Sequence, residues 1–129
     1  MYEINAQHYA NVVKLPAPER YDYFVKRVAD WEKVWTLEGE RGWFGSADDE
    51  GVIHLPLWPH PLFAEMGMVG HSSKAKVVAL DLDDLLDNVL PQLESTQQRV
   101  SVMPFEGGGV SVDPKRLRDD LLAELEKIE

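Results

Sequence analysis

Residues 34–55 read VWTLEGERGWFGSADDEGVIHL, and this stretch decides the fold class. It holds three short β-favouring runs, residues 34–37, 43–47 and 52–55, separated by two turns of glycine and charged residues. Such runs, bounded by turns that contain glycine, are typical of hairpin strands. We therefore expect an antiparallel meander of three strands here.

Helical patterns precede this meander. Apolar residues at helical spacing predict a helix over residues 3–14. A second helix is expected to open at Pro18 or Glu19 and to carry an apolar stripe as far as Trp31.

Strands and helices alternate in the remainder of the chain. The expected segments are one or two helical turns over 60–66, a strand over 75–80, a helix over 82–90, a hairpin of 100–103 with 110–112 around a turn at 106–109, and a helix over 114–128. Pro91 is expected to kink or end the helix before it, because proline lacks an N–H and clashes with the preceding turn.

Hairpins without a strict βαβ rhythm favour an α+β fold. We expect one domain over residues 1–129, with residues 1–17 as a peripheral helical segment. Its mostly antiparallel sheet would have about five to six strands, with helices packed on it.

The chain has 129 residues, a net charge of −10 and no cysteine. The lack of cysteine excludes disulfides, thiol catalysis and cysteine-based metal sites. The negative charge argues against nucleic acid or an anionic membrane as a partner, because both bind positive surfaces. Residues 31–66 hold seven acidic and two basic side chains, which indicates either a surface for a basic partner or simply solvated turns.

Sequence signals for export or membrane insertion are missing. No apolar run approaches the roughly 20 residues of a membrane span. Residues 1–5 show neither the basic nor the apolar region of a secretory signal. We expect a cytoplasmic protein with no membrane partner.

Residues 55–61 read LPLWPHP and are the most unusual stretch of the chain. Three prolines stiffen the backbone and present Trp58 and His60. This segment is either a contact edge with Trp58 as its anchor, or a connector with Trp58 in the core.

We interpret the chain as a non-enzymatic protein-binding module for a basic protein or a second copy of itself. No cofactor, metal or catalytic residue is assigned. The expected binding residues are Trp58, His60, Trp43, His54, Asp48, Asp49 and Glu50.

Two alternatives stay open. One is a small metal-dependent or hydrolytic enzyme that uses His54 and His60 with an acid from residues 48–50, since imidazole and carboxylate suit zinc or iron. The other is a homodimeric structural protein in which an exposed Trp58 packs against its own copy.

Four blocks of the sequence resemble a bacterial family, domain of unknown function number 2750. The blocks are residues 20–35, residues 55–61, residues 81–86 with Leu90 and Pro91, and residues 112–117. The resemblance implies a stand-alone bacterial protein of one domain in the cytoplasm. It carries over no catalytic residue.

Overall fold

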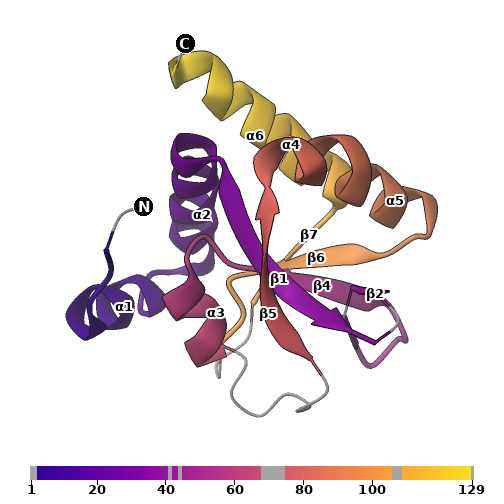
Figure 1. Cartoon of the computed structure of the whole chain (residues 1–129), viewed down its shortest axis with the longest axis horizontal. Coiled ribbons are helices and arrows are strands. Elements are labelled where there is room, and N and C mark those ends of the chain that lie inside the picture. The colour runs from indigo at the N-terminus through magenta and orange to yellow at the C-terminus, as the bar shows by residue number, and fades with distance from the viewer. Residues whose placement is uncertain (1–2, 41, 44, 68–74, 106–108, 129) are drawn as a thin grey trace.

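The computed structural model of the chain describes residues 3–40, 42–43, 45–67, 75–105 and 109–128. The helices lie along two sides of the strands, and the end that holds β2 is free of helices (Figure 1). In chain order the elements are α1 (Ala6–Val13), α2 (Ala17–Trp31), β1 (Lys33–Gly39), β2 (Gly42–Trp43), β3 (Ser46–Ala47), β4 (Ile53–Leu57), α3 (Pro61–Gly67), β5 (Lys76–Asp81), α4 (Leu82–Asp84), the π-helical segment η1 (Leu85–Val89), α5 (Leu90–Ser95), β6 (Arg99–Val102), β7 (Val110–Val112) and α6 (Pro114–Ile128).

The strands form two sheets. Sheet A has the order β2-β1-β5 and is antiparallel throughout. Sheet B has the order β3-β4-β6-β7, and its β4 and β6 run parallel. One bridge joins the sheets: Trp35 N donates to the Trp58 oxygen at 2.8 Å, and Trp58 N donates to the Trp35 oxygen at 2.9 Å.

The α+β class and the packing of helices on strands are confirmed and the mostly antiparallel pairing is confirmed in part, but the expected single sheet of five to six strands is wrong. The described residues hold seven strands in two sheets, and sheet B is mixed. The expected meander is also wrong, because the run 43–47 is divided between β2 of sheet A and β3 of sheet B. The change of sheet occurs at Gly45, where a Cβ would lie 2.7 Å from Ile53 Cγ2 and 2.9 Å from the His54 oxygen. Only glycine allows the chain to pass β4 so closely.

One hydrophobic core lies between the helices and both sheets. The apolar stripe predicted for α2 is confirmed, because Phe24, Val25 and Val28 are buried. The expected final helix is present as α6, and its Leu117 and Leu121 are fully buried. No helix among the described residues is both long and apolar enough to cross a membrane.

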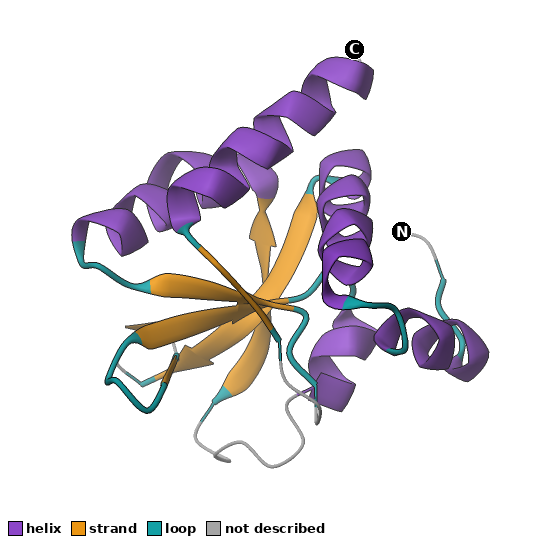
Figure 2. Ribbon diagram, turned by 180° about the vertical axis from the view of Figure 1, so that it is seen from behind, coloured by secondary structure: helices purple, strands orange, loops and turns teal. Residues whose placement is uncertain are grey.

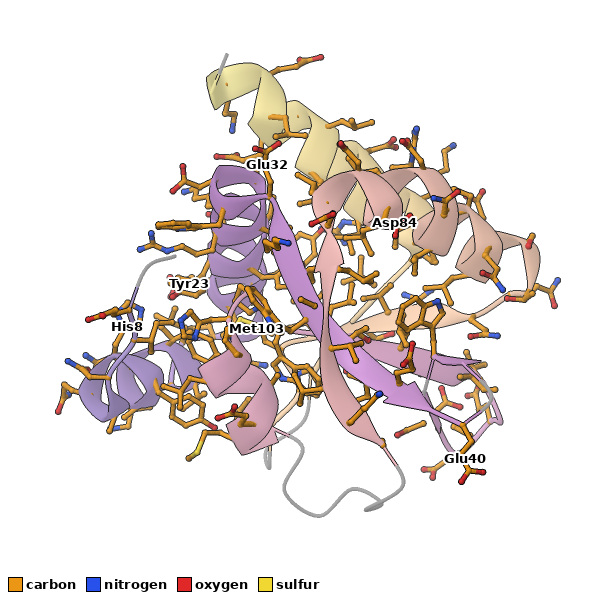
Figure 3. The ribbon with its side chains drawn as sticks, viewed as in Figure 1. His8, Tyr23, Glu32, Glu40, Asp84 and Met103 are labelled. Carbon is orange, nitrogen blue, oxygen red and sulfur yellow. The ribbon has the colours of Figure 1, made fainter. Side chains whose placement is uncertain are left out.

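Helix α1 packs at the side of this core. Its Val12 is buried, and the Tyr9 ring lies 5.4 Å from the Phe63 ring of α3. His8 Nε2 and the Tyr23 hydroxyl are 2.8 Å apart and lie side by side in Figure 3. Residues 6–13 are therefore tied to both α2 and α3.

Pro91 does not end its helix; it lies in the first turn of α5, directly after the π-helical segment. The helix widens to the π form over η1 and continues as α5 to Ser95. A proline at this point lacks an N–H and crowds the carbonyl one turn earlier, and the wider turn relieves that crowding. The Leu86 oxygen accepts a hydrogen bond from Arg118 Nε of α6 at 3.2 Å instead.

The hairpin expected near the C-terminus is confirmed. Strands β6 and β7 pair antiparallel, with Val100 opposite Val112. The turn expected at 106–109 lies outside the described residues except for Gly109.

Candidate functional site

The proline-rich segment 55–61 is a connector, and Trp58 belongs to the core. Trp58 is 1% exposed, and its indole Nε1 donates to the Pro104 oxygen at 2.9 Å. Met103, which Figure 3 labels, has φ 50° and its N donates to the Leu57 oxygen at 2.8 Å, so the chain leaving β6 turns next to β4. An anchor for a partner has to reach solvent, so the structure removes Trp58 from the expected contact face.

His60 is also turned inward. It is 9% exposed, and its ring lies 6.2 Å from that of Trp35. Its Nδ1 accepts a hydrogen bond from Leu62 N at 3.1 Å, at the start of α3. His60 therefore stabilises the entry to α3 and does not belong to a surface with His54. Across the described ranges, no three His, Cys, Asp or Glu side chains gather as metal ligands.

Asp48 builds the turn between β3 and β4. Its Oδ1 accepts hydrogen bonds from the N–H groups of Glu50 and Val52, both at 2.9 Å. Gly51 follows with φ +84°, a conformation that glycine adopts without strain. Asp48 thus has a structural task, whereas Asp49 and Glu50 are exposed and make no ion pair among the described residues.

Two large apolar side chains are exposed close to this turn. Trp43 of β2 is 37% exposed, and Ile53 of β4 is 40% exposed. Ile53 lies against the backbone at Gly45, which is only two residues from Trp43. The same end of the molecule therefore carries both exposed apolar groups and acids, and it faces away from the helices (Figures 1 and 2).

His54 belongs to a different surface, the outer face of sheet B. Its Nε2 lies 2.9 Å from Ser111 Oγ, and Arg99 Nε donates to the same Oγ at 2.9 Å. Its Nδ1 lies 3.2 Å from the Val52 oxygen, which can only accept. In the neutral tautomer with its hydrogen on Nδ1, the ring donates to the Val52 oxygen and accepts the Ser111 hydroxyl hydrogen at Nε2. Donors and acceptors run in one direction from Arg99 through Ser111 and His54 to Val52.

This chain of hydrogen bonds differs from a catalytic triad. The carboxylate of Asp48 lies 3.9 Å from His54 Nδ1, beyond hydrogen-bond range, and the Val52 oxygen takes that position. Arg99 also donates to Ser111 Oγ, which engages a lone pair that a nucleophile would use. The arrangement holds the side chains of Arg99, Ser111 and His54 in place.

A pocket of about 220 Å³ lies beside His54. Its walls are small and mostly apolar, with hydroxyl groups from two strands. The lining residues are Ser46, Ala47, Asp48, His54, Pro56, Ser101 and Pro104.

Sequence reasoning missed Arg99, Ser101 and Ser111. The available signal was the alternation of serine with valine in β6 and β7, which places Ser101 and Ser111 opposite each other on the outer face. Their proximity to His54 depends on the parallel pairing of β4 with β6, in which His54 is the partner of Arg99. Local sequence gives no sign of that pairing.

A second polar contact joins α2 to α6. The Tyr21 hydroxyl donates to Asp120 Oδ2 at 2.5 Å, and the Arg116 guanidinium lies 5.4 Å from the centre of the Tyr21 ring. Burial, followed by the hydrogen bond to the Asp120 carboxylate, raises the pKa of Tyr21 well above its usual value. The contact fixes the two helices against each other.

The comparison with curated proteins found no match. A family model described as "Protein of unknown function (DUF2750)" matches residues 21–121, a range that includes every strand the structure describes. The match covers most of the 129 residues, and it confirms the resemblance seen in the four sequence blocks. The chain belongs to the DUF2750 family.

Proposed function

We propose that this chain is a protein-binding module that docks a basic protein on its helix-free end. The contact surface, which we name the hairpin face, comprises Trp43, Ile53, Glu40, Asp49 and Glu50. The exposure of Trp43 and Ile53 next to three acids carries the proposal.

The hairpin face has the composition that a basic partner requires. Glu40 directly follows β1, and its side chain points away from the molecule (Figure 3). Within the described residues, Glu40, Asp49 and Glu50 have no cationic partner, whereas the nearby Glu38 lies 3.9 Å from Lys76. Unpaired acids attract lysine and arginine of a partner and steer its approach.

The apolar side chains supply the other part of the binding energy. When a partner covers an exposed tryptophan, a large apolar area is removed from water, and this favours binding. Tryptophan is also enriched among the residues that contribute most of the binding energy at interfaces. Trp43 thus takes the role that sequence reasoning gave to Trp58. Asp48 and His54 lie beside the hairpin face. Their hydrogen bonds stabilise the backbone next to it, and they are not counted among its charged contact residues.

The test compares variants in affinity capture from a lysate of the source cells, read by quantitative mass spectrometry. The face variant combines Asp49→Asn, Glu50→Gln and Trp43→Ala. A matched control, Asp87→Asn with Glu94→Gln, removes the same charge from exposed positions of η1 and α5. We expect a basic protein that the wild type and the control retain at low salt, and that the face variant loses by more than tenfold.

Salt and oligomeric state complete the test. Electrostatic attraction between exposed charges weakens at high salt, so capture should fall as ionic strength rises. A partner retained equally by the face variant, or equally at both salt concentrations, would overturn the proposal. Light scattering that shows a dimer abolished by Trp43→Ala would assign the hairpin face to a second copy instead.

A further inference from the structure

Arg99 is a partly buried cation on the outer face of sheet B, and no carboxylate among the described residues pairs with it. Within the described residues none of the ion pairs includes Arg99, although the chain has a net charge of −10. Its one hydrogen bond there is from Nε to Ser111 Oγ.

The guanidinium of Arg99 is held in position. Ser111 Oγ accepts from Nε and lies 2.9 Å from His54 Nε2, and His54 Nδ1 lies 3.2 Å from the Val52 oxygen. Each link in this chain therefore favours one orientation of the next. An arginine has five N–H groups. Those on the two terminal nitrogens of Arg99 make no hydrogen bond with the described residues and can donate to a ligand.

Two serine hydroxyls and a pocket lie on the same face of sheet B as Arg99, with Ser101 opposite Ser111 in the pairing of β6 with β7. Ser101 lies two residues from Arg99 on the same face and lines the pocket of about 220 Å³. A Cβ on Gly109 would lie 2.2 Å from Ser101 Oγ, so the bare backbone of Gly109 is needed where it passes this hydroxyl. The Ser101 hydroxyl makes no hydrogen bond with the described residues.

Asp48, an acid that lies beside His54, is already engaged. Its Oδ1 accepts from two backbone N–H groups of its own turn. Its Oδ2 lies near Nδ1 of His54, whereas Ser111 lies at Nε2 on the other side of the ring. Asp48 therefore does not compete for Arg99.

We propose that Arg99, Ser101 and Ser111 form a binding site for a small oxyanion, the carboxylate or phosphate group of a small molecule. A planar guanidinium pairs with such groups through two parallel N–H donors, and these charge-assisted hydrogen bonds are the strong ones. Fixing the donor before binding lowers the entropy cost. This site is separate from the hairpin face and does not depend on a protein partner.

The experiment is a nuclear magnetic resonance titration of the isotope-labelled chain with sodium phosphate and, separately, with sodium acetate. Sodium chloride at the same ionic strength is the control for screening. We expect saturable shifts of the Arg99 Nε–H, the His54 ring and the amides of residues 99–101 and 111. The stronger of the two titrations identifies the kind of oxyanion.

Variants test the assignment of residues. Arg99→Gln should weaken binding at least tenfold, and Ser111→Ala should weaken it while leaving the charge in place. Lys115→Gln removes the same charge from an exposed position and should bind as the wild type does. Shifts that chloride reproduces, that fail to saturate, or that persist in a folded Arg99→Gln variant would overturn the proposal. If Arg99→Gln fails to fold, Ser111→Ala and the chloride control decide the question.

Discussion

Trp58 Nε1 donates a hydrogen bond to the carbonyl oxygen of Pro104 at 2.9 Å. Trp58 directly follows β4, and Pro104 lies just beyond β6, so this bond fastens the ends of the two parallel strands. Gly67 at the end of α3 completes the contact, because a Cβ there would lie 2.4 Å from the same oxygen. Three segments far apart in the sequence thus meet at one indole.

The indole contact predicts a large difference between two tryptophans. Trp58→Phe removes the N–H donor and leaves a gap in the core, and we expect a loss of about 1–3 kcal/mol in the free energy of unfolding. Trp43→Phe, at an exposed position, should change it by less than about 0.5 kcal/mol. Urea denaturation measures both. Equal losses would show that Trp58 is not a core residue.

Gly67 should not tolerate any side chain. In Gly67→Ala the new methyl group would lie 2.6 Å from Trp58 Nε1 as well as against the Pro104 oxygen. We expect a destabilisation of about 1–3 kcal/mol from overpacking. Met66→Ala, at the exposed neighbouring position, serves as the control and should have little effect on the urea midpoint.

Arg118 and Pro91 should be energetically coupled. Arg118→Met keeps the aliphatic stem but leaves the Leu86 oxygen without its donor, at a cost of about 1–3 kcal/mol. Pro91→Ala restores an N–H, which in the π-helical register donates to the same oxygen, just as Leu90 N donates to the Leu85 oxygen. Arg118→Met should therefore cost less in the Pro91→Ala background. A double-mutant cycle measures this difference, and strict additivity would contradict the prediction.

Tyr21 should make stability fall at alkaline pH. Its pKa is raised in the folded state, so above about pH 10 the unfolded chain loses a proton that the folded chain keeps. The stabilisation is fully present below that pH and declines as the pH rises. In Tyr21→Phe, the free energy of unfolding should fall less steeply above about pH 10. Denaturation curves collected across this range check it, and an identical slope in both proteins would contradict it.

Elements whose structure depends on residues close together in the sequence could be predicted. The apolar stripe of α2 follows helical periodicity, and β6 and β7 alternate valine with serine. The turn at Asp48 was also expected from its glycine and acids. In each case, neighbouring residues alone determine the structure.

Pairings between distant segments could not be predicted. Alternation shows which side chains of a strand share a face, but it does not name the neighbouring strand. Arg99 reaches the side of His54 only through the parallel pair of β4 and β6. The proline-rich segment posed the same problem, because stiffness alone does not show whether Trp58 faces solvent or the core.

The parallel pairing of β4 with β6 has a consequence for synthesis of the chain. Strand β4 ends at Leu57, and its partner β6 spans Arg99–Val102, so the ribosome must release residues 58–102 before that pairing can form completely. Until then Leu55 and Leu57, both fully buried in the finished molecule, are left without their cover from β6. We expect chaperones to bind this apolar segment of the nascent chain. The segment becomes buried once β6 has been synthesised and pairs with β4.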